Sequence, residues 1–211
     1  MTECEAQVGA FQGWKVAECD ALIHDLRKII IDLRFFGCAC AIFPDDWDEL
    51  IQGDSRKVFG ESEHCCVITC MYQALEMARE RTTDDTIVFV FDSRPQRSST
   101  YELVHRQYRH MTESGMAGRP IPLGISFLSS AMFTPLQAAD LVAWEFYHYA
   151  KERKVSGKIA DPRAHLGRLV ETGRFFLQLV DRGTIEQLSK MKVPSGLGAG
   201  NAFPDFPARR T

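Results

Sequence analysis

The feature that most constrains the fold is one short segment, residues 86–92, which reads Thr-Ile-Val-Phe-Val-Phe-Asp. Its β-branched and aromatic side chains are typical of a strand, and a carboxylate closes it. A second short strand is expected at residues 123–128. Helical periodicity surrounds both segments. We therefore expect an α/β layered fold in which helices alternate with short strands and the connections are largely parallel.

The spacing of apolar residues predicts the remaining elements. The expected helices cover residues 19–34, 62–81, 100–112, 134–153 and 164–180, and a further strand covers 38–43. The helix at 134 begins with Thr134-Pro135, a capping residue followed by proline at the first helical position. The polar segment 52–61 is expected to be a loop. On the helix at 19–34 we expect Arg27 on the polar side, opposite an apolar face formed by Leu22, Leu26, Ile29, Ile30 and Leu33.

Length and composition limit the class of protein. A chain of 211 residues favours one domain, which we expect over residues 1–193, followed by a Gly/Pro-rich C-terminal tail over 194–211. Hydrophobic residues make up 45% and charged residues 25%, which excludes a wholly disordered chain. A net charge of -3 gives no global basic field, so nucleic-acid binding would require a local patch.

The sequence also carries expectations about location. No apolar run reaches the roughly 18 residues that a membrane span needs. The first residues lack the basic and apolar regions of a signal peptide. We therefore expect a cytoplasmic protein without membrane association, whose seven cysteines are reduced thiols.

Polar residues at two places are candidates for a functional site. Asp92 stands at the carboxyl end of a strand, where α/β folds open their crevices, although capping of the following turn explains it equally well. On the helix at 134–153, Gln137, Asp140, Trp144 and His148 share one face. Small and apolar neighbours indicate a largely buried helix. A buried Asp140 would need a cation, an arginine or hydrogen-bond donors as its partner, and the alternative is a structural hydrogen bond to a neighbouring loop.

The cysteines are interpreted as core residues and not as a zinc site. We take the side chains of Cys38 and Cys40 to point to opposite faces of a strand. Cys66 and Cys70 are one turn apart on a helix, and no second Cys-x-x-Cys pair supplies the usual spacing of a closed four-ligand site.

A local basic cluster follows Asp92 in the sequence and has tyrosines interleaved with it. It fits either a groove for a phosphate backbone or an ordinary solvated helix face. Its members are Arg94, Arg97, Arg106 and Arg109.

The segment 133–145, Phe-Thr-Pro-Leu-Gln-Ala-Ala-Asp-Leu-Val-Ala-Trp-Glu, resembles the family catalogued as domain of unknown function 3800. The marks of that family are a Gln-x-x-Asp motif on a late helix, here Gln137 and Asp140, and an earlier strand that ends in Asp, here Asp92. The resemblance covers roughly residues 22–151. It implies a ribonuclease-H-like fold, with a short, mostly parallel sheet flanked by helices.

The same resemblance implies a site and a reaction. Asp92 and Asp140 match carboxylates that hold divalent metal, so both are candidate catalytic residues and ligands for Mg²⁺ or Mn²⁺. Gln137 is the third candidate, bonding to a ligand or orienting Asp140. The implied activity is metal-dependent hydrolysis of a phosphodiester. The basic cluster, by itself, suggests nucleic acid as a partner.

The chain departs from the family near its start. The family carries an Asp-Glu pair on a first strand, whereas here about twenty unpatterned residues precede a helix. We therefore expect the first hairpin of the fold to be missing. Two functions remain open: a divalent-metal-dependent nuclease or phosphoesterase, and a non-catalytic relative that serves binding or assembly. In either case a second copy or a partner chain would cover the open sheet edge.

Overall fold

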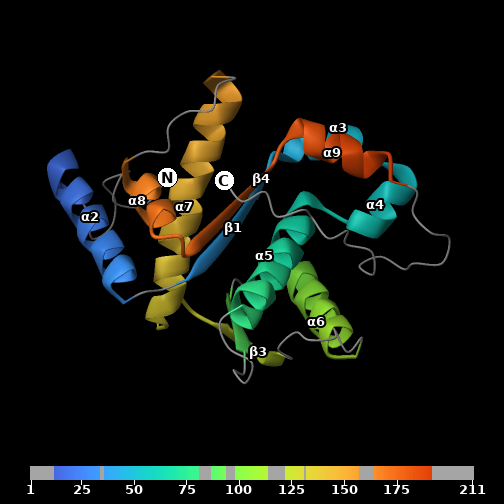
Figure 1. The fold of residues 1–211 in the computed structure, drawn as a ribbon, viewed down its shortest axis with the longest axis horizontal. Helices are drawn as coiled ribbons and strands as arrows, with labels where there is room; N and C mark the ends of the chain where they lie inside the picture. The colour runs from blue at the N-terminus through green and yellow to red at the C-terminus, as the bar shows by residue number, and fades with distance from the viewer. Residues whose placement is uncertain are drawn as a thin grey trace. The chain divides into compact units, whose positions relative to one another are not determined.

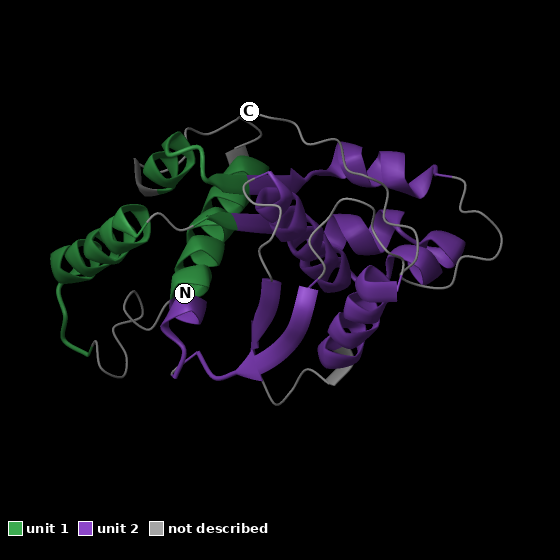
Figure 2. Cartoon of the chain, turned by 60° about the horizontal axis from the view of Figure 1, so that its bottom comes forward, with its two compact units in different colours: residues 1–37, 138–176 green, residues 38–137, 177–211 purple. Residues whose placement is uncertain are grey.

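The structure is a computed structural model that describes residues 12–33, 36–80, 87–93, 98–113, 122–130, 132–156 and 164–191. The chain divides into two compact units, each built from two segments (Figure 2). The first unit holds residues 1–37 and 138–176, and the second holds 38–137 and 177–211. The predicted single domain is not tested by this division, and the predicted tail at 194–211 lies outside the described residues.

The first unit is helical. It contains α2 (Val16–Asp32), the part of α7 (Thr134–Ser156) that follows Gln137, and α8 (Ala164–Glu171) (Figure 1). Helix α2 packs against α8. Its core is formed by apolar side chains from the three helices: Cys19, Ile30, Leu141, Val142, Phe146, Ala150, Leu166 and Leu169.

The second unit contains a parallel pair of strands, β2 (Ile87–Asp92) and β3 (Pro122–Leu128). Parallel strands require a crossover connection, and α6 (Ser98–Glu113) supplies a helix in it. Helix α6 packs against β3 and lies beside α5 (Ser62–Arg79) (Figure 1). The core between them is formed by Met71, Leu75 and Met111, with Ile87, Phe89 and Phe91 packed against it.

The remainder of this unit is built around a second two-stranded sheet, β1 (Gly37–Ile42) paired with β4 (Phe175–Val180). Three short helices accompany it: α3 (Pro44–Leu50), α4 (Gly53–Phe59) and α9 (Arg182–Ser189). Their shared core contains Trp47, Ile51, Val58, Phe59, Cys65, Val180, Ile185 and Leu188. The indole N–H of the fully buried Trp47 donates to the carbonyl of Gly60 at 3.0 Å.

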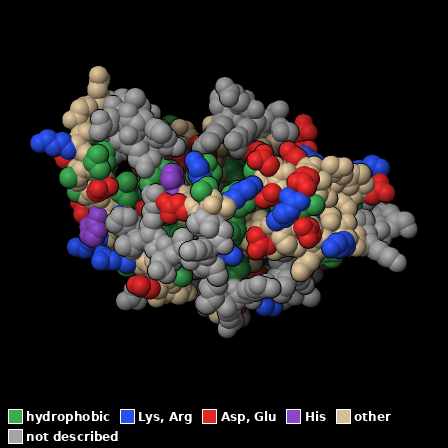
Figure 3. Space-filling view, turned by 90° about the horizontal axis from the view of Figure 1, so that it is seen from above, with side chains coloured by type: hydrophobic (Ala, Val, Ile, Leu, Met, Phe, Trp, Pro, Cys, Tyr) green, Lys and Arg blue, Asp and Glu red, His purple; other side chains and the backbone are tan. Residues whose placement is uncertain are grey.

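Ion pairs join the outer surfaces of these short helices. Arg182 of α9 binds Glu49 of α3, with 2.8 Å between Nη1 and Oε2, and also contacts Asp46. Arg56 of α4 pairs with Asp48 and Glu61. Acidic and basic side chains are accordingly intermixed on this surface (Figure 3). Such exposed pairs contribute little stability individually, so the apolar core holds these helices in place.

Several predicted elements are confirmed. The strands at 87–92 and 122–128 and the helix that begins at Thr134 lie where the sequence places them, and the chain is mixed α/β. Across the described residues, no helix is long and apolar enough to cross a membrane.

Other predictions are wrong. The segment 52–61, expected as a loop, contains α4. Charged residues precede Val58 and Phe59 in it, but these two side chains are buried in the core and anchor the helix. The helix expected at 164–180 ends at Glu171, since Gly173 adopts a positive φ of 65° and the chain then forms strand β4. Cys19 is disulfide-bonded, so not all seven cysteines are reduced thiols.

Gly60 offers a test of the turn between α4 and α5. It has φ 70° and ψ -152°, a region that is essentially restricted to glycine, and a Cβ there would lie 2.8 Å from Nδ1 of His64. We expect Gly60→Ala to lower the free energy of unfolding by about 2–3 kcal/mol. Urea denaturation followed by tryptophan fluorescence measures it.

Gly53 provides the matched control. Its φ is also positive, at 57°, but a Cβ there meets nothing within 4 Å. Gly53→Ala is therefore expected to lower the free energy of unfolding by only about 1 kcal/mol. Equal losses in the two variants would contradict the close approach of His64.

Candidate functional site

Asp92 lies at the carboxyl edge of the β2–β3 pair. It is the last residue of β2 and stands opposite Leu128, the last residue of β3. The N–H of Ser93 donates to the Leu128 carbonyl at 2.8 Å, which extends the pairing by one residue. The Asp92 carboxylate accepts a hydrogen bond at Oδ1 from the N–H of Ser130, at 3.0 Å. Its position is the one at which parallel sheets open a crevice.

Gln137 reaches the same place from the start of α7. Its side-chain Nε2 donates to the carbonyl of Ser130 at 3.0 Å. The main chain of Ser130 therefore binds both residues. Its carbonyl accepts a hydrogen bond from Gln137, and its N–H donates one to Asp92. The structure thus brings together two of the three residues that the sequence selects. Ser130 was not selected from the sequence, because a hydrogen bond made by the main chain does not depend on the residue type.

Asp140 follows one turn later on α7, in the first unit. Its side chain is exposed, so the expectation of a buried carboxylate at this position is wrong. That expectation relied on small neighbours, but Ala139 and Ala143 are exposed as well. Alanine favours a helix whether or not it is buried, so it does not identify the buried face.

The buried carboxylate of α7 is Glu145, which was not selected from the sequence. It is 1% exposed and pairs with Arg27 of α2, itself 3% exposed, with 3.7 Å between Oε1 and Nε. The prediction that Arg27 lies on the polar side of α2 is wrong. Helix α2 buries Cys19, Arg27 and Ile30 and leaves three of the expected apolar residues exposed, namely Leu26, Ile29 and Leu33.

The donors at the Asp92 edge suit a hard cation by their chemistry. Asp92 carries a carboxylate and Gln137 an amide oxygen, which are ligand types that Mg²⁺ and Mn²⁺ accept together with water. Within the described ranges, no group of three or more His, Cys, Asp or Glu side chains is placed to hold a metal ion.

The basic cluster is described in part. Arg106 and Arg109 lie exposed on α6, whereas Arg94 and Arg97 lie outside the described residues. Tyr101, one of the interleaved tyrosines, packs against Phe127 of β3 with 4.3 Å between ring centroids. This ring therefore serves the packing of α6 on the sheet.

The cysteines correct another expectation. Cys38 and Cys40 both face α5, where Cys38 contacts Cys70 and Cys40 contacts Cys66 through their thiols. The statement that they point to opposite faces is wrong, because only successive residues of a strand alternate and residues two apart share a face. Two residues of strand rise by about 6.6 Å and four residues of helix by about 6 Å. The spacing on β1 therefore matches the spacing on α5.

The two members of the Cys38–Cys70 pair differ in acidity. The Cys38 thiol donates to the Cys70 carbonyl at 3.4 Å. Hydrogen bonding between the two side chains, together with burial, raises the pKa of Cys38, and the same side-chain hydrogen bond lowers the pKa of Cys70.

Comparison with known proteins gives no match: no protein-family model, no curated protein and no solved structure is similar to the chain. The class of protein is therefore described by its fold and its site: a mixed α/β chain with a polar cluster at the carboxyl edge of a parallel strand pair. The resemblance to domain of unknown function 3800 stays a prediction.

The contact between Asp92 and Ser130 predicts a difference between two variants. Asp92→Ala removes the acceptor of the Ser130 N–H, and we expect it to lower the free energy of unfolding by about 1–2 kcal/mol. Asp92→Asn keeps an acceptor oxygen, so its free energy of unfolding should fall by no more than about 0.5 kcal/mol. Urea denaturation of both variants measures this. Equal destabilisation would show that the carboxylate does not act through this hydrogen bond.

The facing thiols predict a cross-link. Diamide, an azo oxidant that takes up two hydrogens as a dithiol becomes a disulfide, is expected to join Cys38 to Cys70 and Cys40 to Cys66. Peptide mass spectrometry identifies the linked pairs. Cys70→Ser should abolish the first link and keep the second, whereas Cys65→Ser should keep both. Links between other pairs would contradict the placement of β1 against α5.

Proposed function

We propose that the chain is a divalent-metal-dependent phosphodiester hydrolase whose site lies at the carboxyl edge of β2 and β3. One observation carries the proposal: Asp92, at the end of β2, and Gln137, at the start of α7, are held together by the main chain of Ser130. A carboxylate at such an edge, joined to a late helix, fits the arrangement that the family resemblance implies. Crevices at this edge are common ligand sites in α/β folds.

The residues of this edge fit a hard divalent cation by donor chemistry. Asp92 would hold Mg²⁺ or Mn²⁺ there, and the family resemblance implies Asp140 as a second carboxylate ligand. When bound, such an ion lowers the pKa of a water and stabilises a leaving oxygen.

The chain's own residues have separate roles in this proposal. Asp92 is fixed at the strand end, because its Oδ1 receives the Ser130 N–H. Gln137 is a positioning residue that keeps the start of α7 on the loop after β3. Arg106 and Arg109, exposed on the crossover helix α6, are the described part of the basic cluster that would attract a phosphate backbone.

A second candidate is a non-catalytic binding or assembly module. The observation that favours it is that the Asp92 and Gln137 side chains both bind the main chain of Ser130, which is what structural residues do. In that case the polar cluster closes the turn between β3 and α7. Metal binding separates the two candidates.

Titration of Mn²⁺ into the full chain by calorimetry tests the proposal. We expect saturable binding that weakens about tenfold or more in Asp140→Asn and in Asp92→Asn, since each loses a charged ligand. Gln137→Ala should weaken it by about 10- to 100-fold, as removal of a positioning partner does. The binding variants are then assayed for Mn²⁺-dependent cleavage of single- and double-stranded DNA and RNA.

Asp54→Asn is the matched control, because Asp54 is an exposed carboxylate that pairs only with the neighbouring Lys57 in the described part of α4. It should leave Mn²⁺ binding unchanged. Absence of binding in the unmodified chain, or equal binding in all variants, would overturn the hydrolase and favour the binding module.

A further inference from the structure

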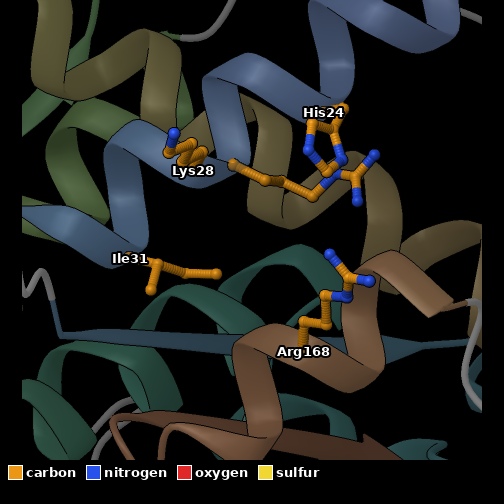
Figure 4. A pocket seen from close by; sticks show the side chains of 5 residues that line it. His24, Lys28, Ile31 and Arg168 are labelled. Atoms are coloured by element: carbon orange, nitrogen blue, oxygen red, sulfur yellow. The ribbon is translucent and has the colours of Figure 1, made fainter.

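A pocket in the first unit, separate from the proposed metal site, is lined almost entirely by basic side chains. It has a volume of about 330 Å³ and lies between α2 and α8. Figure 4 shows His24, Lys28 and Ile31 on α2, with Arg168 extending from α8 toward them. Arg27 is the fifth lining residue. The lining therefore holds three permanent cations and a histidine, with no acidic side chain among them.

Arg27 is the buried member of the pocket lining. Its side chain is 3% exposed, and neither Nε nor Nη2 has a hydrogen-bond partner. Its ion pair with Glu145 spans 3.7 Å, longer than a hydrogen bond. A buried guanidinium with unfilled donors is costly, because it has lost water without gaining acceptors in exchange.

Charges of both signs act on Arg27. Burial lowers its pKa, Glu145 and Asp20 act in the opposite direction, and the nearby Arg168 lowers the pKa further by like-charge repulsion. Lys28 and His24 lie exposed at the rim. An anion in the pocket would relieve the repulsion between the two arginines and provide acceptors for the exposed donors of Arg168 and Lys28.

We propose that the pocket between α2 and α8 binds a phosphate group carried by a small molecule. Two guanidinium groups and an ammonium suit a phosphate, which accepts several charge-assisted hydrogen bonds at once. The volume is at the lower end of the range for small-molecule sites, about 300–1,000 Å³, which favours a compact ligand. Ile31 adds an apolar side to the pocket, against which the organic part of a phosphate monoester would pack.

The test is calorimetry of the full chain with inorganic phosphate, phenyl phosphate and benzoate at constant ionic strength, in the presence of EDTA. EDTA removes divalent metal, so the result is independent of the proposed hydrolase. We expect saturable binding of both phosphates, tighter for phenyl phosphate because of Ile31, and weaker binding of benzoate because of its smaller charge. Binding of benzoate alone, or of none of the three, would overturn the proposal.

Variants on two helices locate the site. Arg168→Gln and Lys28→Gln each remove one exposed cation, and each should weaken phenyl phosphate binding about tenfold or more. Lys151→Gln, an exposed basic residue of α7 outside the pocket lining, is the matched control and should bind as the unmodified chain does. Far-UV circular dichroism checks that each variant is folded. Unchanged affinity in both pocket variants, or an equal loss in the control, would place the anion elsewhere.

Discussion

Parallel pairing of β2 and β3 is the constraint on which the arrangement of the candidate site depends. Two parallel strands cannot be joined by a tight turn, so the chain must cross over between them, and α6 lies in that connection. The same pairing brings both strand ends to one edge of the sheet. Asp92 and the loop that carries Ser130 become neighbours there, although 38 positions separate them in the sequence. Proximity at the site is therefore a consequence of strand direction.

In the first unit a different requirement operates, the neutralisation of a buried charge. Arg27 and Glu145 lie among the apolar residues of α2 and α7, where an unpaired charge would be strongly disfavoured. Removal of either partner would leave the other buried without its opposite charge. Such a pair restricts which helix faces can meet more strictly than leucines and isoleucines do, because apolar side chains are interchangeable and opposite charges are not. The buried face of α2, which contains Arg27, agrees with this restriction.

The sequence predicts much of the local structure, because local preferences are strong in the segments concerned. The run Ile87–Asp92 is β-branched and aromatic, and Thr134-Pro135 is a helix start. Asp92 was selected from its position at a strand end, and Gln137 from the helix face that it shares with Asp140 and from the family motif. Helix α4 and strand β4 were missed, since α4 has only Val58 and Phe59 as buried anchors and β4 follows a glycine turn within an apolar run. The buried face of α2 was misassigned because apolar residues occur on more than one side of it, and only tertiary packing decides between them.

The contact at Ser130 has a consequence for how such a site varies among sequences. Both of its hydrogen bonds use the main chain, so the side chain at this position does not enter into the link between Asp92 and Gln137. Nearly any amino acid could stand there without breaking it. Proline is the exception, because it has no N–H to offer. Substitutions would therefore be tolerated at a residue that joins the two polar side chains, and its importance would be visible only in three dimensions.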